Sequence, residues 1–87
     1  MTLQEQFDQA VQEITTITRR PSKEELLTLY GYFKQATEGD VTTPRPKGFD
    51  FKEIAKHDAW TERKGLSKED AMNAYISEVG RLVNLYR

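Results

Sequence analysis

The 87-residue sequence contains no cysteine and only one histidine, His57. The lack of cysteine excludes a disulfide framework, a thiol nucleophile and a cysteine-ligated zinc site, and one histidine alone does not make a metal-ligand set. Glycine-rich phosphate loops of the P-loop or Rossmann type are also absent. The serines (Ser22, Ser67 and Ser77) show no spacing that suggests a serine–histidine–acid triad. We therefore expect a protein that is not an enzyme and that holds no metal or cofactor.

The chain also lacks an excess of one charge and a long apolar run. Its 13 basic residues nearly balance its 14 acidic residues, whereas proteins that bind nucleic acid through phosphates are usually clearly basic. No apolar run approaches the ~18 residues of a membrane span. The polar start TLQEQFDQA resembles neither a signal peptide nor a transit peptide. We expect a soluble, cytoplasmic monomer with no nucleic-acid partner and no integral membrane insertion.

Four helix starts are visible along a chain whose length predicts one domain, residues 1–87. Each start is a capping box, in which a side chain accepts a hydrogen bond from the N–H three residues on and an acid there reaches back. The four pairs are Thr2–Glu5, Ser22–Glu25, Asp50–Glu53 and Ser67–Asp70. Apolar residues at helical spacing follow each box, and no alternating stretch predicts a strand. The pattern predicts an all-α protein.

The expected ends of the helices and their connections differ in character. The first helix is predicted to reach Ile17, the second to stop at Gly39, and the third to end at 63–65 before the fourth begins. The segment 39–48 holds two prolines and two glycines, which exclude regular structure and make a long connection. The short links RRP and GLS instead favour antiparallel neighbours for the first and last helix pairs.

Three aromatic residues gather beside a lysine in the string YGYFKQAT. Tyr30 and Lys34 are four residues apart and share a helix face, with Phe33 beside both. The third predicted helix carries a similar set: Lys52, Lys56 and Trp60. Taken alone, each set favours a simpler interpretation, in which the rings are core and the lysines reach solvent. Together the two helices predict a cleft suited to a nucleotide phosphate with a stacked purine.

The strings LYGYFKQATEGD, RP, DFKEIAKHDAW and KGLSKEDAMNAYISEV, in this order and spacing, resemble the acyl-CoA-binding proteins over essentially the whole chain. The resemblance implies a four-helix bundle of up-down-down-up topology. It also implies non-covalent binding of medium- to long-chain acyl-CoA esters without turnover. The implied role is that of an intracellular carrier and pool buffer, with transient contact to acyl-CoA-using enzymes or membranes.

The same resemblance implies a set of ligand-binding residues. Tyr30, Lys34 and Lys56 match the family's contacts to the 3′-phosphate of CoA, and Phe33 stands where the family usually has an adenine-stacking tyrosine. Tyr75 matches a fourth-helix tyrosine near the bound ligand. The apolar groove and the basic rim of the site are matched by Leu26, Leu27, Lys52 and Arg20.

Several positions depart from the family pattern. Phe33 lacks the tyrosine hydroxyl, Thr15 replaces a lysine often found on the first helix, and His57 stands where many members have tryptophan. RPKG replaces the usual RPG and displaces the loop glycine to Gly48. Two other function classes are compatible with a small helical domain: a module whose groove takes a partner helix, and an enzyme such as a thioesterase or isomerase.

Overall fold

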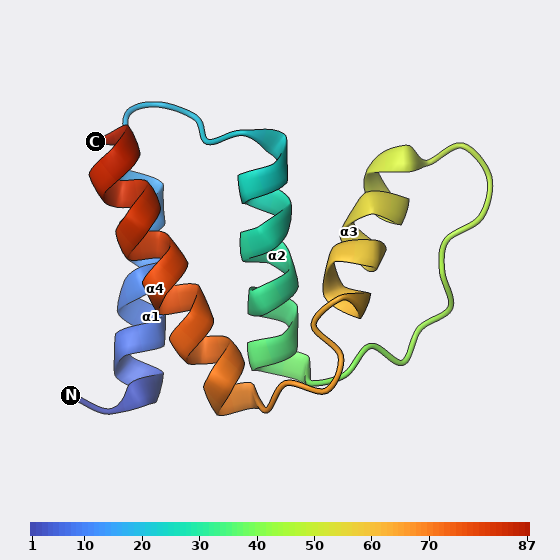
Figure 1. The fold of residues 1–87 in the computed structure, drawn as a ribbon, viewed down its shortest axis with the longest axis horizontal. Coiled ribbons are helices and arrows are strands. Elements are labelled where there is room, and N and C mark those ends of the chain that lie inside the picture. Colours follow the sequence, from blue (N-terminus) through green and yellow to red (C-terminus); the bar gives the residue numbers. More distant parts are fainter.

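The structure, a computed structural model, describes all 87 residues as four α-helices without a strand. The helices are α1 (Leu3–Glu13), α2 (Lys23–Glu38), α3 (Phe51–Thr61) and α4 (Lys68–Tyr86), and a short 3₁₀ helix, η1 (Ile14–Thr16), follows α1. In Figure 1, α1 and α4 run upward while α2 and α3 run downward. The predicted all-α class and up-down-down-up topology are confirmed.

Two of the predicted capping boxes are complete. The Thr2 hydroxyl accepts from the Glu5 N–H at 3.1 Å, and the Glu5 carboxylate accepts from the Thr2 N–H at 2.9 Å. Ser22 and Glu25 exchange the same pair of bonds, at 3.1 and 2.8 Å. Each box satisfies two backbone donors that a helix start otherwise leaves free, so α1 and α2 begin where the sequence predicts.

The other two predicted boxes are wrong in their second half. Asp50 and Ser67 each accept from the N–H three residues on, but no acid reaches back to them. Asp70 is one methylene shorter than glutamate, which limits its reach. Glu53 instead lies 3.6 Å from the ammonium group of Lys56. Single caps are thus sufficient to begin α3 and α4.

Helix ends agree less well with prediction than helix starts. α2 ends at Glu38 and is capped by Gly39, whose φ of +80° suits glycine, so the predicted stop at Gly39 is confirmed. The first helix was predicted to reach Ile17, but α1 ends at Glu13. There, hydroxyls of the two following threonines donate to carbonyl oxygens three residues back and compete with helical pairing. α3 likewise ends at Thr61, and a turn leads to Gly65 at φ +99°.

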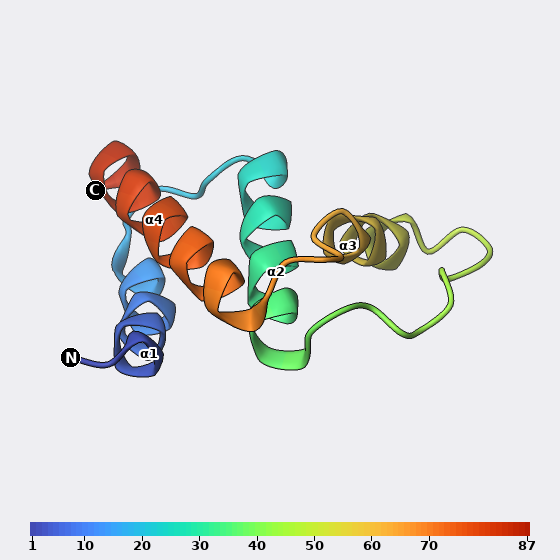
Figure 2. The same ribbon diagram turned by 60° about the horizontal axis from the view of Figure 1, so that its bottom comes forward.

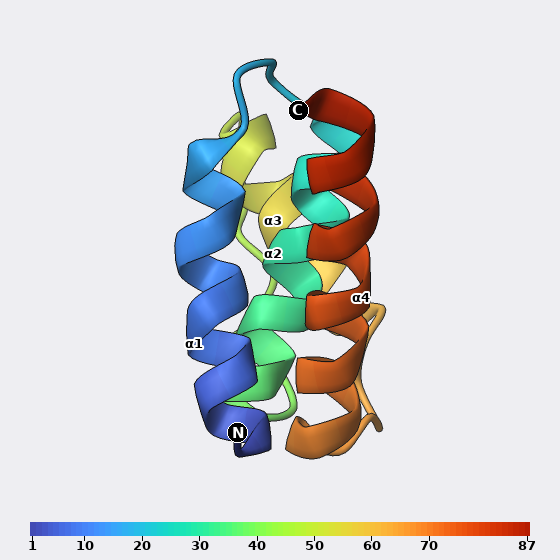
Figure 3. The ribbon, with the colours of Figure 1, turned by 90° about the vertical axis from the view of Figure 1, so that its left-hand side faces the viewer.

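The core lies where α4 packs against both α1 and α2 (Figures 1 and 3). Its buried side chains are Phe7, Ala10, Leu29, Ala36, Ala71, Tyr75, Val79, Leu82 and Val83. The expectation that the short links join neighbouring helices was wrong. The close pairs are α1–α4, α2–α4 and α2–α3, because α4 carries an apolar stripe wide enough to cover both α1 and α2. α3 is left to pack on α2 alone, at one side of the molecule (Figure 2).

The contact between α2 and α3 depends on a close backbone approach at Gly31. A Cβ atom at this position would lie 2.5 Å from the carbonyl oxygen of Ala59 on α3. Three cation–π contacts also join α2 to α3 or to the turn that follows it, with the cation 4.3–4.8 Å from the ring centroid. The three pairs are Lys56 with Tyr30, Lys34 with Trp60, and Arg63 with Tyr32.

The long connection between α2 and α3 has no regular structure, as predicted, yet it is tied to α3. Arg45 donates two hydrogen bonds, of 2.9 and 3.0 Å, to the carboxylate of Asp58. Nε2 of His57 lies 2.8 Å from the carbonyl oxygen of Thr43, which accepts its proton. The single histidine of the chain therefore helps to hold the connection in place.

Glu25 ties the start of α2 to the end of α4. Its Oε1 atom accepts from the Ser22 N–H at 2.8 Å and from the Tyr86 hydroxyl at 2.6 Å, and its Oε2 atom accepts from Arg81 at 3.1 Å. The Tyr86 hydrogen bond is the largest of several causes that lower the pKa of Glu25 to about 2. The carboxylate form is therefore the one that the fold stabilises.

Gly31→Ala should destabilise the protein by roughly 1–3 kcal/mol, a typical cost of overpacking, because the new methyl group meets the backbone of α3. Gly80→Ala is the matched control, since a Cβ atom at Gly80 on α4 would meet nothing within 4 Å. It should stabilise the protein by about 0.5–1 kcal/mol through helix propensity. Urea unfolding of both variants measures the difference, and equal effects would contradict the close approach at Gly31.

The stabilising contribution of Glu25 should depend on pH. Its folded-state pKa of about 2 lies below the ordinary value of 4.5, so the contribution is full above pH 4.5 and is lost as pH falls toward 2. Glu25→Gln should lower the free energy of unfolding at neutral pH, and the difference from the wild type should shrink across this window. The control is Glu24→Gln, at a neighbouring carboxylate without a hydrogen-bond partner. A Glu25→Gln difference that does not vary with pH would disprove the assignment.

Candidate functional site

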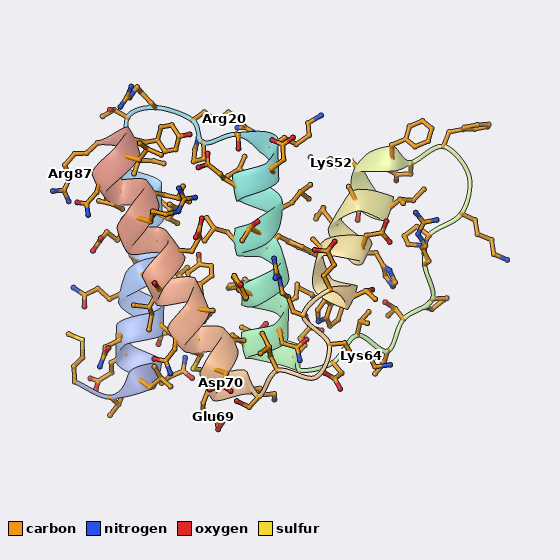
Figure 4. The ribbon with its side chains drawn as sticks, in the orientation of Figure 1. Arg20, Lys52, Lys64, Glu69, Asp70 and Arg87 are labelled. Carbon is orange, nitrogen blue, oxygen red and sulfur yellow. The ribbon has the colours of Figure 1, made fainter.

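A groove of about 430 Å³ opens between the N-terminal halves of α2 and α3. Figure 4 labels Arg20 before the start of α2 and Lys52 at the start of α3, both at the same end of the molecule. The lining residues are Arg20, Lys23, Leu26, Leu27, Tyr30, Phe51, Lys52, Ala55 and Lys56.

Helical periodicity explains why these residues meet. Residues spaced by three and four positions share one face of a helix, and the lining follows this spacing on α2: Lys23, Leu26, Leu27 and Tyr30. The facing surface of α3 carries two pairs at the four-residue interval: Phe51 with Ala55, and Lys52 with Lys56. Since α2 and α3 run in the same direction, the first turns of both helices border one end of the groove.

The groove combines an apolar floor with a positively charged rim. Four of its lining residues are basic and none is acidic. Arg20, Lys23 and Lys52 make no ion pair within 4.0 Å, while Lys56 makes one at 3.6 Å with a carboxylate of its own helix. The Lys56 ammonium also stands 4.8 Å from the centroid of the Tyr30 ring. This arrangement suits an anionic ligand with an apolar segment.

Six of the nine predicted site residues line this one groove: Arg20, Leu26, Leu27, Tyr30, Lys52 and Lys56. Lys34 lies one turn further along α2 than Tyr30, outside the lining. Its ammonium group pairs with Glu38 and stands 4.8 Å from the centroid of the Trp60 ring. The lysine and aromatic residues of α2 and α3 thus alternate across the interface, one turn apart.

Phe33 and Tyr75 also lie outside the groove lining. The Phe33 ring centroid is 6.0 Å from that of Phe7 on α1 and 6.1 Å from that of Tyr75. Tyr75 is only 5 % exposed, and burial raises the pKa of its hydroxyl. Phe33 is partly buried and lies beside Tyr30 on α2, on the side toward α1. The ligand contacts assigned to both residues remain predictions.

Three lining residues were not assigned to the site from the sequence: Lys23, Phe51 and Ala55. Each had a structural explanation, because Lys23 opens a helix, and Phe51 and Ala55 belong to an apolar helix stripe. The available signal was helical spacing, because Lys23 lies four residues before Leu27 and Phe51 lies four residues before Ala55. The structure contains no group of three histidine or acidic side chains placed to hold a metal ion. None of its helices has both the length and the apolar character needed to cross a bilayer.

Comparisons with known proteins agree with this geometry. The family model described as "Acyl CoA binding protein" matches residues 4–79. "Acyl-CoA-binding domain-containing protein 6" of Arabidopsis thaliana is 47% identical over 85 residues, 98% of this chain and 92% of that protein. "Acyl-CoA-binding protein homolog 1" of Caenorhabditis elegans is 49% identical over 80 residues, 92% of this chain and 93% of that protein.

A solved structure supports the same assignment. The crystal structure of Oryza sativa Acyl-CoA-Binding Protein 2 has a TM-score of 0.92 and 44% identity, and the match covers 97% of this chain and 93% of that one. The sequence match spans most of the chain and the structural match extends over all four helices. The chain therefore belongs to the acyl-CoA-binding protein family.

Proposed function

We propose that this protein binds medium- to long-chain acyl-CoA esters without turnover, as a cytoplasmic, monomeric carrier that buffers their free concentration. The observation that carries the proposal is the single groove in which an apolar floor lies under four cations. An acyl-CoA ester has the matching chemistry, because a phosphorylated head is joined to a long apolar tail. The names of the relatives point to the same ligand class.

The apolar floor supplies the driving force for the tail. Leu26, Leu27 and Ala55 line the groove between the two helices. Each CH₂ group that leaves water contributes about 0.8 kcal/mol, and part of this gain is offset by ordering the chain. Affinity should therefore grow with tail length until the groove is filled.

The cations orient the head. The Lys56 ammonium stands 4.8 Å from the centroid of the Tyr30 ring, so the two side chains border the same part of the groove. We assign the 3′-phosphate to this pair together with Lys34, which would exchange its ion pair with Glu38 for the ligand. Phe33 lies next to Tyr30 on α2 and is the ring assigned to the adenine.

The two alternative classes fit the groove less well. A partner helix needs an apolar surface, but four cations around the groove favour an anion instead. An enzyme needs a nucleophile or a general base, and the lining offers only lysines and Tyr30 for that role, with no carboxylate, histidine, serine or threonine to pair with them. The groove therefore favours a carrier over both.

Affinity should rise steeply from acetyl-CoA to palmitoyl-CoA, because each added CH₂ enters the groove. Calorimetric titration with esters of increasing length measures this rise, and a one-to-one stoichiometry is expected. A thiol assay on the same samples should detect no released CoA. Equal affinity for acetyl-CoA and palmitoyl-CoA would show that the acyl tail does not enter the groove, and release of CoA thiol would identify an enzyme.

Lys56→Ala and Lys34→Ala should each weaken binding of palmitoyl-CoA by roughly 1.5–3 kcal/mol, the usual value of a charged hydrogen bond. The same substitutions should hardly change the affinity for 3′-dephospho-palmitoyl-CoA, which lacks the partner group. Lys68→Ala, at the exposed start of α4, is the control for both ligands. If the dephospho ester loses as much affinity as the intact ester, these lysines do not contact the 3′-phosphate.

A further inference from the structure

Two phenylalanine side chains are exposed beside the groove. Phe49, in the connection before α3, is 90 % exposed, and Phe51, the first residue of α3, is 69 % exposed. Their ring centroids are 6.1 Å apart at an interplanar angle of 70°, so the Phe49–Phe51 pair forms one apolar surface. The core is small, so leaving two large aromatic side chains in water costs the protein the stability that their burial would add. Exposed aromatic residues that touch one another in this way mark an interaction surface.

The connection that carries Phe49 is tied to α3 by hydrogen bonds. The connection and α3 project to one side of the molecule (Figure 2). Arg45 and Thr43 of the connection are tied to Asp58 and His57 of α3 by hydrogen bonds of 2.8–3.0 Å. These contacts keep the connection on α3, and the phenylalanines do not fold back onto the core.

Unpaired cations lie beside the phenylalanines in the sequence or across the groove from them. Lys47 and Lys52 flank them in the sequence, and Arg20 lies across the groove at the same end of the molecule (Figure 4). Lys23, in the first turn of α2, also lines the groove. None of these four cations makes an ion pair within 4.0 Å. Their charge is therefore available to an external anion.

The acids nearby offset these cations only in part. Asp50 caps α3 by accepting the N–H of Glu53, and Glu53 pairs with Lys56 at 3.6 Å. Glu24 lines a second hollow, between α2 and α3, that shares no cation with the first. Asp50 and Glu24 keep their charges, but four unpaired cations outnumber them, so this end of the molecule is locally positive although the whole chain has a net charge of −1.

We propose that the Phe49–Phe51 pair and its surrounding cations dock this protein onto the anionic surface of a lipid bilayer. The phenyl rings would enter the headgroup region, where aromatic side chains partition favourably, and the cations would contact anionic headgroups. A projecting apolar pair bordered by lysines suits a soft, negatively charged lipid surface. Phe51 also lines the groove, so docking brings the groove to the membrane. This last step rests on the proposed function, since it lets an acyl-CoA ester held in the bilayer enter the groove directly.

The test is co-sedimentation with vesicles of phosphatidylcholine alone and of equimolar phosphatidylcholine and phosphatidylserine. The wild type should bind the mixed vesicles and bind the neutral ones weakly. Phe49→Ala should lower partitioning onto mixed vesicles about ten-fold, because one phenyl ring no longer leaves water. Lys47→Ala should lower it about five-fold on mixed vesicles and leave neutral vesicles unaffected. Phe49→Trp should still bind the mixed vesicles, and the emission of the new tryptophan should shift to the blue when they are added.

Matched controls come from the rest of the surface. Leu85→Ala removes another exposed apolar side chain, 50 % exposed on α4, and Lys64→Ala removes a cation at the opposite end of the molecule (Figure 4). Neither should alter vesicle binding. Phe49 does not line the groove, so Phe49→Ala should leave palmitoyl-CoA affinity in vesicle-free solution unchanged. If the wild type does not bind palmitoyl-CoA in vesicle-free solution, the proposed function is refuted. The vesicle-binding result would still stand, because it does not depend on that ligand.

Two outcomes would overturn the docking proposal. One is failure of the wild type to bind mixed vesicles, or equal binding by Phe49→Ala and the wild type. The other is self-association of the free wild type in sedimentation equilibrium that Phe49→Ala abolishes. That result would assign the pair to a second copy of the chain.

Discussion

The close approach of α2 and α3 at Gly31 is the constraint on which the rest of the site depends. α3 packs on no other helix, so the spacing of these two backbones sets the width of the groove. At Gly31 the spacing is too small for even a Cβ atom. The two helices diverge toward their N-terminal ends (Figure 1), and Leu26, Leu27 and Tyr30 line the groove there.

The same charged and aromatic side chains hold the two helices together and face the ligand. Lys56 over Tyr30 and Lys34 over Trp60 are contacts between helices, and three of these residues are also assigned to the head of the ligand. A cation over a ring keeps much of its electrostatic capacity toward a further anion, because the ring offers only a partial negative charge. These contacts place the ammonium groups, and it is the ion pairs with Glu38 and Glu53, not the rings, that offset their charge.

Local signals in the sequence predicted the helices well and their arrangement less well. Helix starts follow from side chains within three residues of each other, as at Thr2 and Ser22, so they are readable without a structure. The packing of α4 between α1 and α2 depends on which apolar faces match across the chain, and the lengths of the links pointed to other neighbours. The reciprocal half of the Asp50 and Ser67 boxes failed because it depends on side-chain length and on competing partners such as Lys56.

The groove was predicted only in part, because local spacing identifies residues on one helix but not the residues that face them from another helix. Tyr30 and Lys56 were identifiable from helical spacing and from family resemblance. Lys23 and Phe51 were explained by local structure, and nothing in their spacing alone placed them opposite each other. Phe33 and Tyr75 lie outside the groove lining because of tertiary packing. Phe33 contacts Phe7 on α1 and Tyr75 on α4, and no local pattern reveals these neighbours.

The parallel course of α2 and α3 has an electrical consequence. Peptide dipoles in a helix add up to a partial positive charge at its N-terminus, and here two such termini border the same end of the groove. Backbone N–H groups of their first turns therefore add to the potential made by the four side-chain cations. This backbone contribution has no side chain to remove. It therefore persists when the lysines are replaced one by one, set against the negative charge of Asp50, Glu53, Glu24 and Glu25 at the same helix starts.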